Sequence, residues 1–354
     1  MSTPPLHIGI AGAGLLGRLL AWKLLQQGHK VSLYDKGSRV GEGSAARVAA
    51  SMLAPYTEVV HAERQVFDWG LMALGWWPEQ LARLNAETGL TIDHAINGSV
   101  AVAHELDKSS MTHFYQSLKT LLPDRLQHVR QLDRQQLAAL EPELAEGFQQ
   151  GLYLAEEGYL DNWALLSALN AAIDRLGGEF VEYAEIHDIQ PGQLSVGHEQ
   201  RQFDWVVDSR GIGAKSALPK LRGVRGEILW VHAPEVQLSR PVRLMHPRYK
   251  LYISPRPHRH YVIGATEIES ESMAPVTVRS SLELLSALYS VHSGFAEAKV
   301  EHSFAHCRPA MPDNLPVVEV QPGLITVNGL YRHGYLLSPY VVEKALASFA
   351  DFVV

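Results

Sequence analysis

The stretch HIGIAGAGLLG, residues 7–17, decides the fold. Its first five residues, His7–Ala11, are typical of a short buried strand, and a helical pattern runs from residue 15 to about residue 27. The turn between them has the spacing G-x-G-x-x-G. In this turn Gly12 allows a tight bend, Gly14 lets a pyrophosphate approach the backbone, and Gly17 permits close packing of helix on strand.

The residues that follow complete a dinucleotide-binding unit. Gly28 ends the helix, residues 30–34 form a second strand, and Asp35 stands 23 positions after Gly12, where a carboxylate can accept the hydroxyls of an adenosine ribose. The alternative is a glycine turn that occurs by chance. The two strands, the helix and the acidic residue together favour dinucleotide binding, but the same unit serves NAD and FAD.

Composition limits the class of protein. The 354 residues, 46% hydrophobic and 19% charged, are enough for about two domains with a large core. The net charge of −7 gives no broad attraction to nucleic acid or anionic lipid, so we expect neither as a partner. The single cysteine forms no internal disulfide, no cleavable leader precedes the first strand, and no apolar run reaches the ~20 residues of a membrane span. A cytoplasmic protein is therefore expected.

The segment after Asp35 bears on the choice of dinucleotide. Residues 37–43 are rich in glycine, and residues 44–55, SAARVAASMLAP, are mostly small. Small residues at this density let a backbone lie against a flat ring system. An alanine-rich helix packed in a core is the alternative interpretation.

Five segments, in order along almost the whole chain, resemble motifs of the D-amino-acid oxidase superfamily, in particular of glycine oxidases of the thiamine-pathway type. Residues 44–55 are similar to its S-x-A-A-x-G-M-L-A-P motif. The other similarities are residues 157–169 to E-G-x-V-D-P-x-x-L-x-x-A-L, residues 252–266 to Y-I-x-P-R…V-G-A-T, residues 307–316 to x-R-P-x-T-P-D-x-x-P, and residues 329–339 to G-H-x-R-x-G-x-x-L-A-P. The resemblance implies an FAD-dependent oxidoreductase of amino acids or amines.

The resemblance and the pattern of elements predict an α/β fold with two interleaved domains. An FAD-binding Rossmann-type domain, of the glutathione-reductase-like kind, is expected from residues 1–90, 148–220 and 305–354. Residues 91–147 and 221–304 are expected to form an α+β substrate domain on a mixed, largely antiparallel sheet. Its predicted helices are residues 108–121, 134–140 and 278–290.

The resemblance also implies which residues contact FAD. They are Gly12, Gly14, Leu16, Gly17, Asp35, Lys36, Ser44, Ala45, Arg47, Ser51, Met52, Leu53, Arg210, Gly211, Gly329, Tyr331, Arg332, His333, Gly334, Tyr335 and Leu336. Monomeric sarcosine oxidases of this superfamily tether the flavin through a cysteine in a segment similar to 307–316. Aligned on Pro-Asp, Cys307 lies one residue closer to that dipeptide, and adjacent strand residues point to opposite faces, so we expect non-covalent FAD.

Three residues are candidates for orienting a substrate against the flavin. An arginine suits a carboxylate because its planar fork gives two parallel charge-assisted hydrogen bonds, and we assign this role to Arg308. The resemblance implies Tyr252 as a further phenolic donor and Arg332 beside the flavin and the substrate amine. The alternative for each arginine is a solvated or ion-paired surface position.

The chain departs from the family pattern at several positions. Ser51 stands in place of the expected glycine, Leu330 of histidine and Met311 of threonine. Residues 208–211, DSRG, replace small residues before a glycine. Arg210 either contacts the flavin or faces solvent, and we prefer the solvent-facing alternative. These departures weaken the assignment of one substrate.

No metal site is expected. His258 and His260 form a tempting pair, but the flanking Arg256 and Arg259 would repel a cation, so residues 256–260 are interpreted as a polar hairpin turn.

Three functions remain open. The first is oxidation of glycine or another small amino acid, with oxygen reoxidising the flavin to give hydrogen peroxide. The second is a related amine or D-amino-acid dehydrogenase, or a modification enzyme, that acts on a larger amine and uses another acceptor. A tRNA-modifying version should have a basic face, which the net charge disfavours. The third is a flavoprotein that assists assembly or maturation without turnover. A homo-oligomer is compatible with each.

Overall fold

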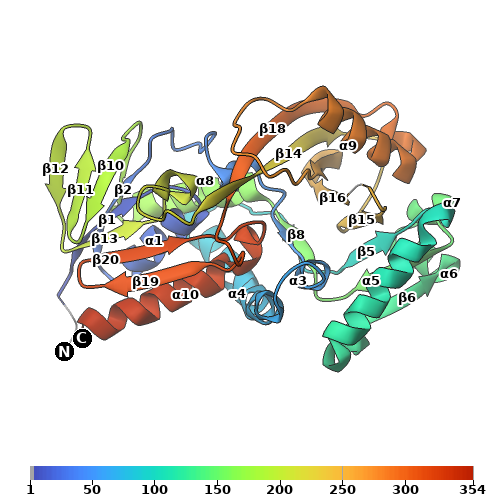
Figure 1. The fold of residues 1–354 in the computed structure, drawn as a ribbon, viewed down its shortest axis with the longest axis horizontal. Helices are drawn as coiled ribbons and strands as arrows, with labels where there is room; N and C mark the ends of the chain where they lie inside the picture. Colours follow the sequence, from blue (N-terminus) through green and yellow to red (C-terminus); the bar gives the residue numbers. More distant parts are fainter. Residues whose placement is uncertain (1–3, 249, 354) are drawn as a thin grey trace.

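The computed structural model describes residues 4–248 and 250–353. A mostly parallel sheet and a larger mixed sheet lie at opposite ends of the molecule, and the chain crosses between them several times (Figure 1). The predicted α/β fold with interleaved Rossmann-type and substrate parts is confirmed.

The first sheet has the strand order β19-β20-β13-β1-β2-β9. Its strands pair in parallel except β19, which runs antiparallel to β20 at the edge. The strand bounds are β1 (His7–Ala11), β2 (Lys30–Tyr34), β9 (Glu179–Val181), β13 (Trp205–Asp208), β19 (Val317–Gln321) and β20 (Leu324–Asn328). A side sheet of β10 (Ile186–Gln190), β11 (Gln193–Val196) and β12 (Glu199–Gln202) adjoins it.

Helices bury one shared core against this sheet. They are α1 (Leu15–Gln26), α4 (Arg64–Thr88), α8 (Asn162–Arg175) and α10 (Gly334–Val353). Trp22 of α1 and Trp77 of α4 are fully buried there. The indole Nε1 of Trp77 donates to the backbone oxygen of Tyr335, which fixes α4 against the start of α10.

The second sheet has the strand order β18-β14-β17-β16-β15-β5-β7-β6. Its pairs are antiparallel except β15 with β5. The strand bounds are β5 (Ser99–Val102), β6 (Val129–Asp133), β7 (Gln150–Leu154), β14 (Arg222–His232), β15 (Val242–Met245), β16 (Lys250–Arg256), β17 (His260–Gly264) and β18 (Lys299–Ala310). Its helices are α5 (Lys108–Leu121), α6 (Arg134–Leu140), α7 (Leu144–Gly147) and α9 (Val278–Val291).

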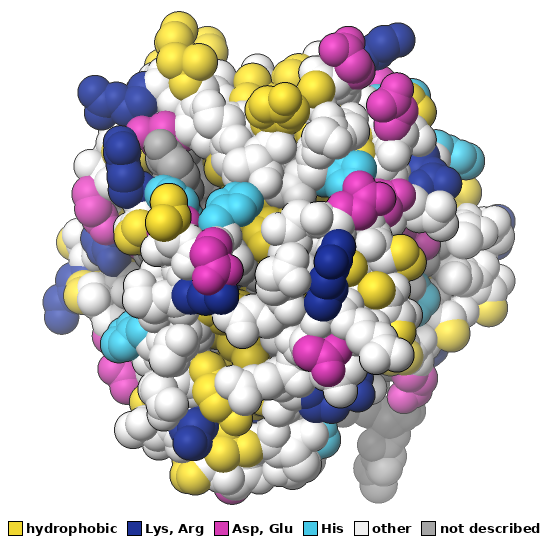
Figure 2. Space-filling model, turned by 90° about the vertical axis from the view of Figure 1, so that its right-hand side faces the viewer, with side chains coloured by type: hydrophobic (Ala, Val, Ile, Leu, Met, Phe, Trp, Pro, Cys, Tyr) yellow, Lys and Arg dark blue, Asp and Glu magenta, His cyan; other side chains and the backbone are white. Residues whose placement is uncertain are grey.

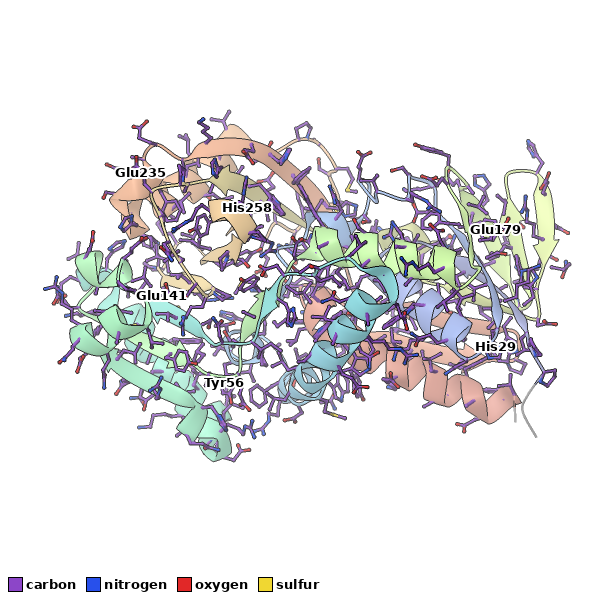
Figure 3. The ribbon with its side chains drawn as sticks, turned by 180° about the vertical axis from the view of Figure 1, so that it is seen from behind. His29, Tyr56, Glu141, Glu179, Glu235 and His258 are labelled. Atoms are coloured by element: carbon purple, nitrogen blue, oxygen red, sulfur yellow. The ribbon has the colours of Figure 1, made fainter. Side chains whose placement is uncertain are left out.

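Short elements connect the two parts. They are the helices α2 (Ala45–Val48) and α3 (Pro55–Glu58), and a small sheet of β3 (Met52–Leu53), β8 (Gly158–Leu160) and β4 (His94–Ala95). In the view from behind, the labelled Tyr56 and Glu141 lie in the substrate part, whereas His29 and Glu179 lie at the opposite end (Figure 3).

The predicted helices 108–121 and 134–140 have the predicted bounds, and the third ends at Val291. One predicted boundary is wrong. Residues 150–154 were placed with the FAD-binding part, but β7 pairs with β5 and β6 in the second sheet. The alternation of buried side chains along a strand does not show which other strand it pairs with. The predicted domain boundary at residue 148 therefore assigns β7 to the FAD-binding domain instead of the substrate domain.

The surface of the substrate part in Figure 2 carries side chains of both charges. Basic, acidic, histidine and apolar side chains are interspersed on that face (Figure 2). In the part of the chain that the structure describes, no helix has both the length and the apolar character needed to cross a bilayer.

Candidate active site

A cavity of about 320 Å³ is lined by residues from both parts of the molecule. One end is formed by the glycine turn after β1 and by the residues that follow β2 and β13. The other end is formed by β14, β16, β18 and the loop that precedes α10. We call these the nucleotide end and the substrate end.

The glycine turn keeps the nucleotide end open. Gly12 has a φ of 95°, and a Cβ there would lie 2.7 Å from the oxygen of Ser209, so a side chain is excluded by both strain and space. A Cβ on Gly17 would lie 1.9 Å from the oxygen of Gly12, so the helix packs directly on the turn. A Cβ on Gly14, in contrast, would meet nothing within 4 Å and would only occupy the cavity.

Asp35 is held at the end of β2 by two backbone donors. Its Oδ2 accepts from the N–H of Ala13 at 2.7 Å, and its Oδ1 accepts from the N–H of Gly37 at 2.8 Å. The carboxylate therefore lies beside the glycine turn and the start of α1. A free helix N-terminus, an open glycine and a fixed carboxylate fit the pyrophosphate and adenosine ribose of FAD.

Arg210 does not face solvent, and the preferred sequence interpretation is corrected. Its side chain is only 11% exposed and lines the nucleotide end. Its Nη2 pairs with Oδ2 of Asp208 at 2.7 Å, and its Nη1 donates to the oxygen of Ile186 at 3.1 Å. The Asp208 carboxylate pairs with the guanidinium and so compensates for the loss of hydration when this arginine is largely removed from solvent.

The small-residue segment passes along the cavity mostly in non-helical conformation. Ala45–Val48 form a short helix, Met52–Leu53 form a strand and Pro55 begins α3, which excludes the alternative of a continuous alanine-rich helix. Ser51 keeps a left-handed φ of 49°, the conformation for which the family uses glycine. Its hydroxyl donates to the oxygen of Leu160 at 2.5 Å and accepts from Nη2 of the buried Arg256 at 2.8 Å. These bonds account for a serine at a glycine position.

Most of the predicted FAD contacts line the cavity. Three do not: Gly17 packs against the turn, Leu53 is fully buried in the core, and Arg47 stacks on Trp163 with its guanidinium carbon 3.7 Å from the ring centroid. The residues that line it are Gly12, Gly14, Leu16, Asp35, Lys36, Ser44, Ala45, Ser51, Met52, Arg210, Gly211, Gly329, Tyr331, Arg332, His333, Gly334, Tyr335 and Leu336.

Arg308 and Tyr252 both line the substrate end, each packed over a glycine of a neighbouring strand. A Cβ on Gly226 would lie 2.3 Å from Nη2 of Arg308, and one on Gly264 would lie 2.7 Å from the hydroxyl of Tyr252. Burial raises the pKa of the Tyr252 phenol, although nearby guanidinium groups oppose the shift. The phenol therefore remains a hydrogen-bond donor at neutral pH.

Arg308 is held only by neutral acceptors. Its Nη1 donates to the oxygen of Arg225 at 3.3 Å and its Nη2 to the oxygen of Thr266 at 3.1 Å. No carboxylate pairs with it among the described side chains. Its charge is thus available to an anion in the cavity.

Arg332, in contrast, pairs with two acidic residues, Glu58 and Glu267, that were not predicted from the sequence. Its Nε lies 2.7 Å from Oε2 of Glu58, and its Nη1 lies 2.9 Å from Oε2 of Glu267. The Nδ1 of His333 is 3.2 Å from Glu58, and Nη2 of Arg243 is 3.6 Å from it. Burial opposes ionisation of Glu58, but these neighbours outweigh burial and hold its pKa well below the usual range.

Arg308 differs from the two other arginines at the substrate end. Among the described side chains that line it, Arg332 pairs with Glu58 and Glu267, and Arg243 lies 3.6 Å from Glu58. Arg308 has no carboxylate partner among these side chains, so its guanidinium can pair with an anionic group.

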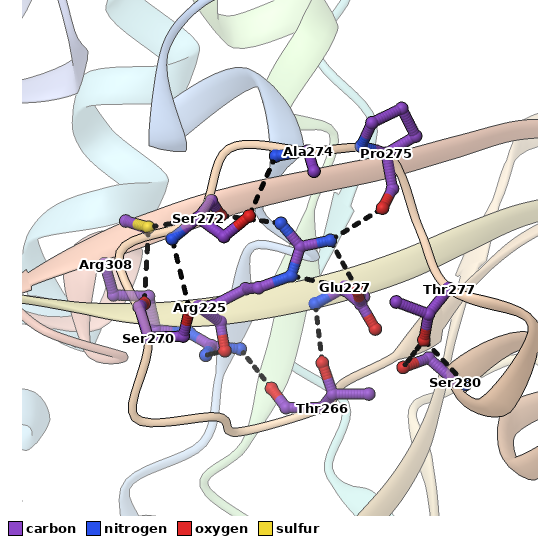
Figure 4. Close-up of polar contacts among 11 residues, drawn as sticks. Arg225, Glu227, Thr266, Ser270, Ser272, Ala274, Pro275, Thr277, Ser280 and Arg308 are labelled. Atoms are coloured by element: carbon purple, nitrogen blue, oxygen red, sulfur yellow. Dashed lines mark hydrogen bonds and ion pairs between the residues drawn. The ribbon is translucent and has the colours of Figure 1, made fainter.

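A buried ion pair fixes the loop against which Arg308 rests. Nε and Nη2 of Arg225 donate to Glu227 at 2.9 and 2.5 Å, and the same guanidinium donates to the oxygens of Ser272 and Pro275 (Figure 4). Thr266, whose backbone oxygen accepts a hydrogen bond from Arg308, is joined to this network because its hydroxyl accepts from the N–H of Glu227. The Sγ of Cys307 is 3.6 Å from the oxygen of Ser270 and so points toward the loop.

Comparison with known proteins agrees with this architecture. The profile of the DAO family, described as FAD dependent oxidoreductase, matches residues 7–345. A Rhizobium etli protein assigned as a thiamine biosynthesis oxidoreductase, ThiO, is 39% identical over 334 residues, which cover 94% of this chain and 93% of that protein. A bifunctional ThiO/ThiG protein of Trichormus variabilis is 28% identical over 98% of this chain, which spans only 52% of that protein.

The fold is shared with a solved enzyme. The crystal structure of glycine oxidase from Geobacillus kaustophilus superposes with a TM-score of 0.84 at 24% identity, covering 99% of this chain and 95% of the other. The profile match over residues 7–345 and the 39% identity to the Rhizobium etli protein establish that the chain belongs to the DAO family of FAD-dependent oxidoreductases.

Proposed function

We propose that this enzyme oxidises glycine or another small amino acid with one carboxylate, using non-covalently bound FAD. The observation that carries the proposal is the Arg308 guanidinium, which lines the same cavity as Tyr252 and has only neutral hydrogen-bond partners among the described residues. The names of the relatives, a thiamine biosynthesis oxidoreductase and glycine oxidases, support the same substrate class.

The residues of the chain orient the substrate. Arg308 binds the carboxylate with its planar fork, and the Tyr252 hydroxyl donates to the same group. When bound, FAD would supply the acceptor for a hydride from the substrate α-carbon. The amine would also lose a proton and become an imine, hydrolysis of which gives the oxo acid and ammonia, and oxygen would accept the two electrons to form hydrogen peroxide.

Arg332 and its acidic partners keep the amine side of the site rigid. The ion pairs with Glu58 and Glu267 fix the guanidinium, whose pKa they raise against the effect of burial. A fixed cation beside a bound flavin would favour the electron-rich reduced ring. The glycine turn, Asp35 and the residues at the start of α10 would hold the cofactor.

The absence of a covalent bond to flavin is supported by Cys307, whose thiol points toward the Ser270 oxygen. Acid or heat should release intact FAD from the purified protein. Yellow colour that stays with the denatured polypeptide would contradict this part of the proposal.

The substrate class is tested by anaerobic reduction of the purified flavoprotein. Glycine, sarcosine, D-alanine, D-aspartate and carboxylate-free ethylamine are compared by the rate at which they bleach the flavin absorbance. We expect glycine or another small monocarboxylate to act fastest, and air to restore the colour with one hydrogen peroxide per turnover. Faster bleaching by ethylamine would refute carboxylate recognition, and recovery without peroxide would indicate a dehydrogenase.

A further inference from the structure

A second cluster of ligand-type side chains lies on the substrate sheet, and none of its members lines the cavity. His232 ends β14, His260 begins β17 and Glu301 lies near the start of β18. These strands are neighbours, and His232 is directly paired with His260 in the β14–β17 register. One ligand atom from each side chain lies within 4.8 Å of the other two.

The orientation of His260 is fixed from both sides. Its Nδ1 lies 3.1 Å from the backbone oxygen of Pro257, and its Nε2 lies 3.1 Å from Oε2 of Glu301. A carbonyl oxygen can only accept, so Nδ1 carries the hydrogen. In a neutral imidazole the Nε2 lone pair then faces a carboxylate, and this contact requires either a second proton or a cation between the two atoms.

His232 favours the cation. Its ring stacks on His260 with centroids 4.7 Å apart and planes 22° apart, and no hydrogen-bond partner for it occurs among the described residues. A second proton on His260 would give Glu301 a hydrogen bond, but the His232 imidazole would still have no hydrogen-bond partner among the described residues. One metal ion would engage all three groups, and a histidine that donates its other N–H to a backbone carbonyl is the usual arrangement around a metal.

The arginines that argued against a metal in the sequence are directed elsewhere. Arg256 donates to the oxygen of Ala50 inside the molecule, and Arg259 donates to the oxygen of Val236 and the side chain of Gln237. Lys299, opposite His232 on β18, is exposed, so its ammonium group can remain in water. Figure 3 shows His258 in the substrate part. It lies between β16 and β17 with a left-handed φ of 59°, and it is not a member of the cluster.

We propose that His232, His260 and Glu301 bind one divalent transition-metal ion of the zinc type. Two imidazoles and one carboxylate form a known zinc ligand set, with the remaining positions open to water. The ligands come from three adjacent strands, so the bound ion ties the outer ends of β14, β17 and β18 together. Binding therefore stabilises the folded chain.

The test uses the FAD-containing protein after removal of metals with a chelator. Zinc ions alone are titrated calorimetrically and in thermal unfolding. We expect one equivalent to bind, Tm to rise, and EDTA to reverse the rise. His260→Ala and Glu301→Gln should each weaken binding at least about tenfold while flavin absorbance and circular dichroism stay unchanged. The matched control is His258→Asn, which removes a nearby imidazole at a left-handed position that asparagine tolerates and should bind zinc as the parent does.

The outcomes separate the proposal from its alternatives. Failure of zinc to bind the parent protein would show that the contact between His260 and Glu301 forms without a metal ion. Undiminished binding by both cluster variants, or equal loss in His258→Asn, would place the ion elsewhere. Each of these results overturns the proposal, and none depends on substrate turnover.

Discussion

The two ends of the cavity are built in different ways. At the nucleotide end, backbone groups and small residues from contiguous motifs do most of the work, and Asp35 is held by the N–H groups of Ala13 and Gly37. At the substrate end, charged side chains from distant segments neutralise one another, as Glu58 and Arg332 do across 274 positions. The first end depends on space, and the second depends on charge balance. Substitutions should therefore fail differently at each.

Gly14→Val tests the dependence on space and should have the largest effect. The added side chain occupies only the cavity, so the protein should fold but contain no FAD and show no turnover. The ratio of flavin to protein absorbance and the circular dichroism spectrum measure both properties. Gly75→Val is the matched control, because a Cβ there also meets nothing within 4 Å but lies outside the cavity. Normal flavin content in Gly14→Val would show that the glycine serves only the turn.

Arg308→Ala tests charge at the substrate end. Among the described side chains at the substrate end, Arg308 is the guanidinium without a carboxylate partner. Its loss should reduce kcat/KM for the preferred amino acid by roughly 2–5 kcal/mol, about 30- to 5,000-fold, with full FAD content. Oxidation of a simple amine should fall much less. Equal losses on both substrates would indicate a structural residue. Unchanged kinetics would shift the assignment to Arg332.

Glu157→Gln tests whether a buried carboxyl group outside the cavity lining is protonated. Burial raises the pKa of Glu157 to about 7, although Ser99 and the N–H of Thr57 donate to its oxygens. The folded state therefore keeps a proton that the unfolded state loses above pH ~4.5, and the free energy of unfolding falls as pH rises from about 4.5 to 7. This fall is roughly 3 kcal/mol.

Glutamine cannot ionise and can make both hydrogen bonds, so the variant should lose this pH dependence and be more stable than the parent protein at pH 8. Denaturant unfolding at pH 5 and pH 8 measures the difference. Parallel pH profiles of the two proteins would contradict the buried, protonated state.

Tyr252→Phe should have the smallest effect. Its hydroxyl supplies one hydrogen bond to a carboxylate that Arg308 already holds, worth about 1 kcal/mol, so KM should rise roughly fivefold. The bond is present before and during hydride removal, and kcat should therefore change little. A large fall in kcat with constant KM would instead place the phenol at the reacting centre.

The nucleotide end could be predicted from the sequence because its contacts are local. Gly12, Gly14 and Asp35 lie within one strand-turn-helix-strand unit whose geometry is fixed by short-range chemistry. The predicted helix 108–121 was equally accessible, since its apolar period of 3.6 is a local property. These predictions needed no knowledge of which distant strands meet.

The substrate end required that knowledge. Glu58 and Arg243 carry no motif of their own, and their importance follows only from the fold that brings them to Arg332. The solvent-facing prediction for Arg210 is wrong because the fold pairs its guanidinium with Asp208, two residues earlier. Glycines at positions 226 and 264 were the available signal, because each leaves room for a substrate-binding side chain of a neighbouring strand.

Ser51 has an evolutionary consequence. Its left-handed backbone is accepted together with the hydrogen bonds from Arg256 and to Leu160, so the identities of residues 51 and 256 are epistatic. Arg256→Lys should be harmful beside serine and milder beside glycine, whose backbone needs no compensating bond. A library that varies one position at a time would therefore record Arg256 as less tolerant of change than it is once residue 51 is glycine.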